Sequence, residues 1–304
     1  LDECKEFGTL PFAHLARAAF MSIAILKSAV KAKIISEEAL NSFLSSIETV
    51  SHEFTADLQT LNKSKTKDSW EKFLNKYGHL RPGTYDITSL SYFEAKDKYL
   101  SKENKFNSNS KLSDKKIWNE EKKFLFDELR KEGLSFSNEE FENFLYSSIE
   151  GREYSKFIFT KNLSKSLDYL IEFGESFELD REFLSHLPLS SFYDYQKGII
   201  NDISLKETYS KISLESSNQR RIENYIELPL LITSEEDFLA FKEPKSKPNY
   251  IGTQTAVAEI IELKNINDNL LVNSLKGKIV LIENADPGYD WIFSGDICGL
   301  ITMY

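Results

Sequence analysis

One short stretch of this sequence gathers side chains that could grip an anion. Residues 76–86 read KYGHLRPGTYD, and Pro82-Gly83 suits the centre of a type II turn. Arg81 precedes a proline, which favours extended backbone, so His79 and Arg81 are expected to point the same way. A guanidinium fork beside an imidazole suits a phosphate or a carboxylate, and Asp86 is close enough along the loop to hold either cation.

A structural turn is the competing interpretation of these residues. In that interpretation Arg81 pairs with Asp86 and no ligand is involved, and on residue types alone it is the stronger of the two. His14 and Arg17 form a second candidate anion site, because they are three residues apart near the first turn of a predicted helix. The competing interpretation of His14 and Arg17 is a solvated helix face, and on these residues alone it is stronger than the anion site.

The elements that must position these residues are predicted to be helices. Apolar residues recur at helical spacing over 12–35, with Thr9 as a candidate N-cap and Pro11 in the first turn. Charged residues interrupt this run, which leaves it short of the roughly 20 apolar residues of a membrane-spanning helix. A second helix, capped by Ser36, is expected to extend to Leu61.

Further helices are predicted as far as residue 227. One helix is predicted to end near Tyr77, because Gly78 suits the C′ position. Another helix is predicted to begin after Ser137, which starts a capping box. Helical periodicity continues over 152–173 and 203–227. Residues 101–116 are rich in Lys, Asn and Ser, so we expect a mobile loop there.

The character of the chain changes after Leu228. Prolines punctuate residues 229–250, which predicts a linker or hinge. Beyond it, apolar and β-branched runs predict strands at 255–263, 278–283 and 299–303. The expected fold is therefore a mainly α N-terminal domain of helical hairpins or a bundle over 1–228, followed by a partial α/β domain over 251–304.

Composition limits the classes of partner. The net charge of −10 argues against a general nucleic-acid or anionic-membrane surface, so neither partner is expected. Cys4 and Cys298 can form no disulfide framework and lack metal-ligand spacing, so we expect no metal site, and a reducing cytoplasm is the default. Both ends are expected to be cuts in a longer protein, because the chain begins at Leu1 and stops at Tyr304 after an apolar strand.

Two stretches resemble the phosphoenolpyruvate-utilising phosphotransferases, the family of phosphoenolpyruvate synthase, pyruvate phosphate dikinase and rifampicin phosphotransferase. Residues 76–87, KYGHLRPGTYDI, are similar to the YGHRGPGE-(Y/I)D segment that follows the ATP-binding domain in some members. They depart from it at Leu80, which separates His79 from Arg81, and at Thr84, which replaces a Glu. Residues 278–304 resemble the opening of the swivelling phosphohistidine domain, where a strand leads into a Gly-Gly-x-x-Ser-His motif.

The resemblance implies a function for the parent protein. It would carry an ATP-grasp-like domain before Leu1, use ATP and Mg²⁺ to phosphorylate a histidine beyond Tyr304, and swing that histidine about a hinge at 242–250. The helical part would bind the acceptor, pyruvate or another small molecule, through His79 and Arg81. Residues 1–304 would bind no cofactor and would be inactive alone. Their partners would be the acceptor or a phosphate-bearing ligand, the ATP-binding domain and the rest of the phosphohistidine domain.

A non-enzymatic module is the alternative. The residues by themselves supply no complete catalytic set, no Gly-rich phosphate loop, no His-Glu-x-x-His and no Gly-x-Ser-x-Gly. A helical interaction module or a small-molecule-binding module is the alternative that these residues leave open.

Overall fold

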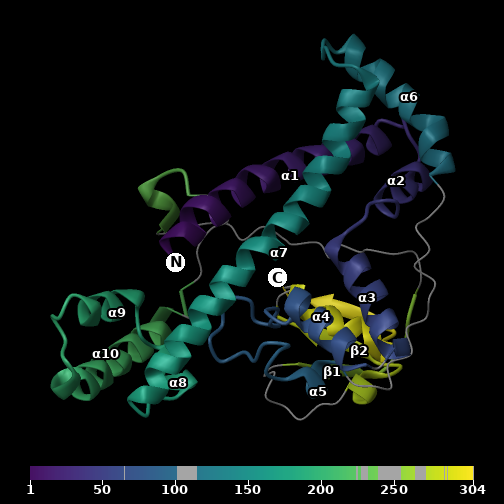
Figure 1. The fold of residues 1–304 in the computed structure, drawn as a ribbon. Coiled ribbons are helices and arrows are strands. Elements are labelled where there is room, and N and C mark those ends of the chain that lie inside the picture. The colour runs from purple at the N-terminus through teal and green to yellow at the C-terminus, as the bar shows by residue number, and fades with distance from the viewer. Residues whose placement is uncertain are drawn as a thin grey trace. The chain divides into compact units, whose positions relative to one another are not determined.

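The structure is a computed structural model that describes residues 1–64, 66–100, 115–223, 225–226, 232–238, 255–263, 272–283, 285 and 287–303 (Figure 1). It is mainly helical, with a small three-stranded parallel sheet near the C-terminus. The chain divides into two compact units. The first combines Leu1–Asp168 with Ala258–Tyr304, and the second is Tyr169–Val257.

This division differs from the expected one, in which a helical domain ended at residue 228. The boundary falls at residue 168, inside a long helix, and the sheet belongs with the first 168 residues. The expected linker at 229–250 lies mostly outside the described residues, which include only 232–238 of it, and the expected loop at 101–116 lies outside them up to residue 114.

The first unit begins with one continuous helical segment. A π-helical stretch, η1 (Cys4–Thr9), leads directly into α1 (Leu10–Lys31), which has Pro11 in its first turn. The prediction that Thr9 caps this helix is wrong: its own backbone is helical, and its Oγ1 donates to the carbonyl of Cys4 at 3.1 Å.

The segment Cys4–Lys31 also meets the length and composition criteria for a membrane-spanning helix, contrary to the expectation from the sequence. Its most apolar 18-residue window has a mean hydropathy of 1.4, and 22% of that window is buried inside the protein. The core helix of a soluble protein can meet the same criteria, so this result is weak evidence for a membrane span.

Six more α-helices lie among the described residues of the first unit. They are α2 (Glu37–Leu44), α3 (Val50–Ser64), α4 (Lys67–Tyr77), α5 (Lys96–Tyr99), α6 (Lys116–Lys131) and α7 (Asn138–Ser176), the last of which continues into the second unit. The predicted caps are confirmed at two of them. The amide of Ala39 donates to Ser36 Oγ at 3.0 Å, and Ser137 and Glu140 exchange the two hydrogen bonds of a capping box.

The single helix predicted from Ser36 to Leu61 is wrong, because the structure divides it into α2 and α3. At the break, Ser46 Oγ donates to the carbonyl of Phe43 at 2.7 Å and so competes with helical hydrogen bonding.

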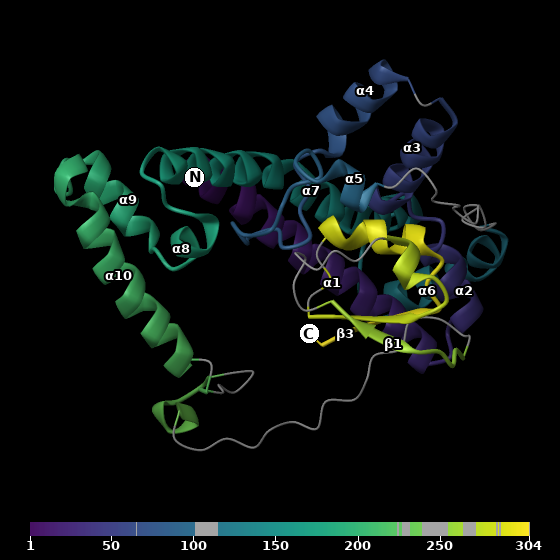
Figure 2. The same cartoon turned by 90° about the horizontal axis from the view of Figure 1, so that it is seen from below.

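α1 lies across the first half of α7, as both views of the ribbon show (Figures 1 and 2). Ser22 Oγ and Ser148 Oγ share a buried hydrogen bond of 2.8 Å at this crossing. A Cβ placed on Gly151 of α7 would lie 3.3 Å from the side chain of Leu15, so the two helices approach each other closely here.

The sheet consists of β1 (Ile260–Glu262), β2 (Ile279–Ile282) and β3 (Gly299–Thr302), paired in parallel in that order. Two 3₁₀ segments, η3 (Val272–Leu275) and η4 (Pro287–Gly295), connect them. The strands predicted from the sequence are confirmed, although the first begins only at Ile260. In Figure 2, η4 lies between the strands and α5, where the rings of Tyr99 and Trp291 are 5.6 Å apart.

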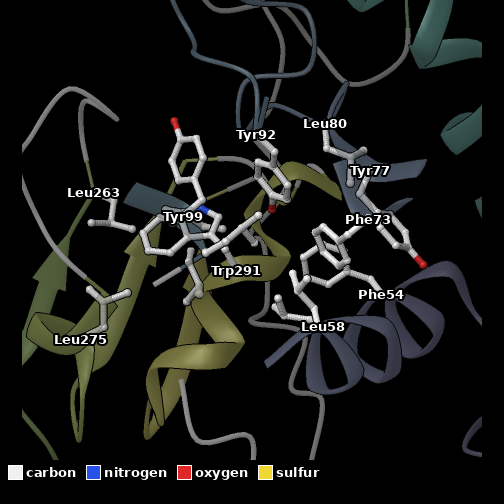
Figure 3. Close-up of a cluster of buried hydrophobic side chains, with 14 of the residues drawn as sticks. Phe54, Leu58, Phe73, Tyr77, Leu80, Tyr92, Tyr99, Leu263, Leu275 and Trp291 are labelled. Carbon is white, nitrogen blue, oxygen red and sulfur yellow. The ribbon is translucent and has the colours of Figure 1, made fainter. Parts of the chain in front are cut away.

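The sheet and the helices share one apolar core. Figure 3 shows the side chains of this cluster, with those from α3 and α4 on one side, those beside β1 and in η3 on the other, and Tyr92, Tyr99 and Trp291 between them. All three of these central residues are at most 3% exposed. The last part of the chain is thus packed into the first unit instead of forming a separate domain.

The second unit contains the end of α7 with α8 (Arg181–Ser185), α9 (Leu189–Gln196), α10 (Asp202–Glu223) and η2 (Glu235–Phe238). Aromatic rings hold it together: Phe173 of α7 packs edge-on against Phe192 and Tyr195 of α9. Tyr209 of α10 is fully buried and donates to the carbonyl of Ser191 at 3.1 Å.

Candidate functional site

Arg81 is buried against α7, with only 2% of the residue exposed. Its Nε donates to Ser164 Oγ at 3.1 Å and its Nη1 to the carbonyl of Ser89 at 2.8 Å. Its Nη2 lies 2.6 Å from Asp168 Oδ1, in a charge-assisted pair. Because every nitrogen of the guanidinium is engaged within the protein, Arg81 holds the loop on α7.

Asp86 does not pair with Arg81, so the predicted partner is wrong. Asp86 Oδ1 accepts hydrogen bonds from the amide of Thr88 at 2.9 Å and from Thr88 Oγ1 at 2.8 Å, which closes its own turn. The true partner of Arg81, Asp168, lies 87 residues further along the chain.

His79 is turned towards α7, as Arg81 is, in keeping with their alternate positions. Its Nε2 lies 3.2 Å from the carbonyl oxygen of Phe157, to which it can donate, and the two rings are 4.9 Å apart. Burial, helped by the charge of Lys161, lowers the pKa of His79 to about 4. The imidazole is therefore neutral near pH 7 and supplies no positive charge for an anion.

This lowered pKa predicts a pH-dependent stability. Between about pH 6.5 and pH 4 the unfolded chain binds a proton at His79 that the folded chain does not, so the free energy of unfolding falls with decreasing pH. We expect His79→Gln, which can still donate to Phe157, to reduce this fall by about 2 kcal/mol. The measurement is denaturant unfolding followed by tryptophan fluorescence at pH 7 and pH 4. His14→Gln on the surface of α1 is the control, and identical pH profiles for His79→Gln and the wild type would contradict the prediction.

His14 and Arg17 are both exposed on α1. Among the contacts of the described residues, none joins them to His79 or Arg81. The residues predicted as a substrate-binding set therefore divide into a buried pair that faces α7, an exposed pair on α1 and Asp86 in its own turn.

The loop that contains Arg81 and Pro82 lies against η4. A Cβ built on Gly288 of η4 would overlap the carbonyl group of Arg81 and the nitrogen of Pro82, so the η4 backbone touches this peptide directly. Tyr92 Oη donates to the carbonyl of Gly288 at 2.8 Å in a buried hydrogen bond. We call this contact of Gly288 with Arg81, Pro82 and Tyr92 the η4 contact.

A second link joins η4 to the start of α3. Ser51 Oγ donates to Asp290 Oδ2 at 2.9 Å. Burial raises the pKa of Asp290 to about 6; the hydrogen bond from Ser51 opposes this shift and the charge of Glu153 adds to it.

A cavity of about 760 Å³ lies between α3 and α7. This volume is within the range of small-molecule sites. Among the described residues, its wall includes the carboxylates of Glu48, Glu53 and Glu150 with the rings of His52 and Tyr154, and no lysine or arginine. None of the residues predicted as binding residues lines it.

The described residues fit no metal ion, since no group of three or more of their His, Cys, Asp and Glu side chains could hold one. Cys4 Sγ lies 3.8 Å from the carbonyl of Phe159, and Cys298 is exposed.

Sequence reasoning missed Ser164, Asp168, Tyr92 and Gly288. A signal existed for the first two, because Thr160, Ser164 and Asp168 follow each other at i, i+4 and so lie on one helix face. Ser164 is 3% exposed, and a polar residue so deeply buried indicates a partner. Tyr92 carried no comparable signal.

Comparison with known proteins found no match: no protein-family model matches this chain, and none of the curated proteins is significantly similar to it.

Proposed function

We propose that residues 1–304 belong to an ATP-dependent phosphotransferase that acts through a phosphohistidine, as the phosphoenolpyruvate-utilising enzymes do. In such an enzyme a histidine nitrogen takes the β-phosphoryl group of ATP and water takes the γ-phosphoryl group, so that AMP and inorganic phosphate are released. An acceptor oxygen then forms an O–P bond as the N–P bond breaks, and the proton of the acceptor passes to the histidine. In this proposal these residues contribute the acceptor side and the base of the carrier.

The η4 contact is the observation that carries this proposal. The two stretches that resemble the family are about 200 residues apart in the sequence, and they meet backbone to backbone at Gly288 and Arg81. A carrier that delivers a phosphoryl group must dock reproducibly on the acceptor side, because transfer depends on accurate positioning. Contact between these two stretches is what such a docking requires.

The geometry changes the roles proposed for the cationic residues. Arg81 is committed to Asp168 and His79 is neutral, so neither is proposed to grip the acceptor. Both fix the loop that receives η4 and are positioning residues. Among the described residues, no group of three or more His, Cys, Asp and Glu side chains could hold a metal ion.

The test uses the protein encoded by the complete gene. It is incubated with Mg²⁺ and ATP labelled in the β-phosphate, and acid-labile label on the protein is measured. Acid-labile, base-stable label is the expected result, because phosphohistidine has that stability. A folded protein that binds ATP and acquires no label would overturn the proposal.

The cavity between α3 and α7 favours a second candidate, a module that binds a small molecule without phosphotransfer. Three carboxylates and two rings, with no lysine or arginine among the described residues of the wall, suit a cationic amine rather than pyruvate or phosphate. Absence of label, together with spermidine binding that Glu150→Gln weakens in a calorimetric titration, would support this candidate over the enzyme.

A further inference from the structure

We propose that the outward side of α1 is a docking surface for a phospholipid bilayer with anionic headgroups, and that α1 lies in the plane of that membrane surface when it is bound. We call this surface the α1 outer face. It comprises Leu10, Arg17, Phe20, Met21, Lys27 and Lys31. The proposal is independent of the phosphotransferase function and concerns a part of the chain that this function does not use.

The first support is an apolar helix surface that the protein leaves uncovered. The most apolar window of Cys4–Lys31 has a mean hydropathy of 1.4, yet only 22% of it is buried. Leu10, Phe20 and Met21 are 56%, 61% and 58% exposed. Leu10, Arg17 and Met21 follow each other at spacings of seven and four residues, so they lie on one side of the helix. The large apolar side chains of α1 are thus gathered where an external partner can cover them.

The opposite side of α1 is fixed within the first unit. Leu26 and Ala29 are 0% and 3% exposed and pack in an apolar cluster with residues of α2, α6 and α7. Ser22 Oγ shares its buried hydrogen bond with Ser148 Oγ of α7. A helix that crossed the bilayer would have to leave these partners. The contacts therefore favour a helix that lies on the membrane over one that spans it.

The second support is the charge of α1. This helix contains Arg17, Lys27 and Lys31, all exposed, and no aspartate or glutamate, although the net charge of the whole chain is −10. Charges more than about 8 Å apart are largely screened at physiological salt, so the local charge of the docked surface governs its attraction to a membrane. The acidic residues of 1–9 precede the N-terminal end of α1. The end near Lys31 is therefore expected to approach the headgroups most closely.

The side chains favour lipid over an acidic protein as the occupant. Phe20 and Met21 suit insertion at the boundary between headgroups and acyl chains, while the long stems of Lys27 and Lys31 let their charges reach phosphate groups. An acidic protein surface would satisfy the charges but would oppose polar groups to the apolar side chains. The interfacial layer of an anionic bilayer offers a partner to both.

The experiment measures vesicle binding by flotation, with the protein encoded by the complete gene and with residues 1–304 in parallel. Vesicles of phosphatidylcholine that contain about 30% phosphatidylserine are compared with vesicles of phosphatidylcholine alone. We expect both proteins to bind the anionic vesicles at least about tenfold more tightly than the neutral ones. Binding should weaken when the salt concentration is raised from about 0.15 M to about 0.5 M.

Two variants separate the charged and apolar parts of the interaction. Lys27→Gln removes one basic contact with the headgroups and Met21→Ser removes one inserted side chain, and each should weaken binding to the anionic vesicles by about fivefold. Lys211→Gln and Leu214→Ser are the matched controls, because both residues are exposed on α10, Leu214 at 65%. The controls should bind as the wild type does.

Met21→Trp provides a readout of insertion. An indole that enters the acyl-chain boundary emits at a shorter wavelength and is quenched by brominated lipid. We expect both effects when anionic vesicles are added to Met21→Trp. The wild type, whose three native tryptophans lie outside α1, supplies the background signal.

Four results would overturn the proposal. The first is a folded protein that leaves the anionic vesicles unbound, and the second is an equal loss of binding in the α1 and α10 variants. The third is binding by residues 1–304 without binding by the complete protein, which would show that another part of the protein covers the α1 outer face. The fourth is a dimer that Met21→Ser dissociates, without any vesicle binding, which would assign this face to a second copy of the chain.

Discussion

Replacing Arg81 by methionine is expected to lower the free energy of unfolding of the first unit by about 3 kcal/mol. The substitution removes the charge that pairs with Asp168 and leaves the Ser89 carbonyl without its donor in a buried position. The loss is placed at the lower end of the range for broken buried pairs because Asp168 remains 37% exposed and can be solvated. Urea unfolding followed by tryptophan fluorescence measures it, since Trp70, Trp118 and Trp291 all lie in the first unit.

Arg130→Met is the matched control for this measurement. Arg130 also pairs with an aspartate, Asp127, but the two side chains are 45% and 58% exposed. Exposed ion pairs contribute little to stability, so the free energy of unfolding of Arg130→Met should remain within about 1 kcal/mol of the wild-type value. Equal effects of the two substitutions would contradict the conclusion that buried Arg81 holds its loop on α7.

Replacing Phe54 by alanine is expected to cost about 3–5 kcal/mol and to loosen the sheet as well as the helices. Phe54 is 1% exposed in α3, and its ring lies 5.1 Å from that of Tyr77 and 5.9 Å from that of Tyr92. Contacts between rings continue from Tyr92 through Tyr99 to Trp291 beside the sheet. A cavity at Phe54 therefore weakens a core that both parts use (Figure 3).

Amide hydrogen exchange of β2 and β3 gives the second readout for Phe54→Ala. If the core is shared, exchange in these strands accelerates together with exchange in α3 and α4. Phe124→Ala is the control, because Phe124 is 52% exposed on α6 and its loss should leave both readouts nearly unchanged. Faster exchange in α3 with normal exchange in β2 and β3 would mean that the sheet is stabilised independently.

Local chemistry explains what could be predicted from the sequence. The caps at Ser36 and Ser137 and the strands near 260, 279 and 299 depend on neighbouring residues, and the structure confirms them. Thr9 failed as a cap because η1 continues the helix through it, although its residue type is suitable.

The candidate site was harder to predict because its determinants are distant in the sequence. Arg81 was identified as important, but its partner was taken to be the nearest carboxylate, Asp86, when it is Asp168 on another helix. His79 was treated as a cation, and only its burial against Phe157 reveals that it is neutral. Gly288 could not be singled out, since a glycine after a proline is first of all a turn residue and only the opposing Arg81 peptide shows why no side chain fits.

The division of the chain has a consequence for its biosynthesis. The second unit is one uninterrupted stretch, Tyr169–Val257, whereas the first needs residues from both sides of it. As the ribosome elongates the chain, Phe54, Tyr77 and Tyr92 emerge long before Trp291 and Ile292 arrive to cover them. All of the second unit is synthesised before the sheet, so these aromatic residues wait exposed for their last packing partners, and nascent chains with exposed apolar residues are prone to aggregate. Chaperone binding during translation should therefore concentrate on the first 100 residues and end when the sheet is completed.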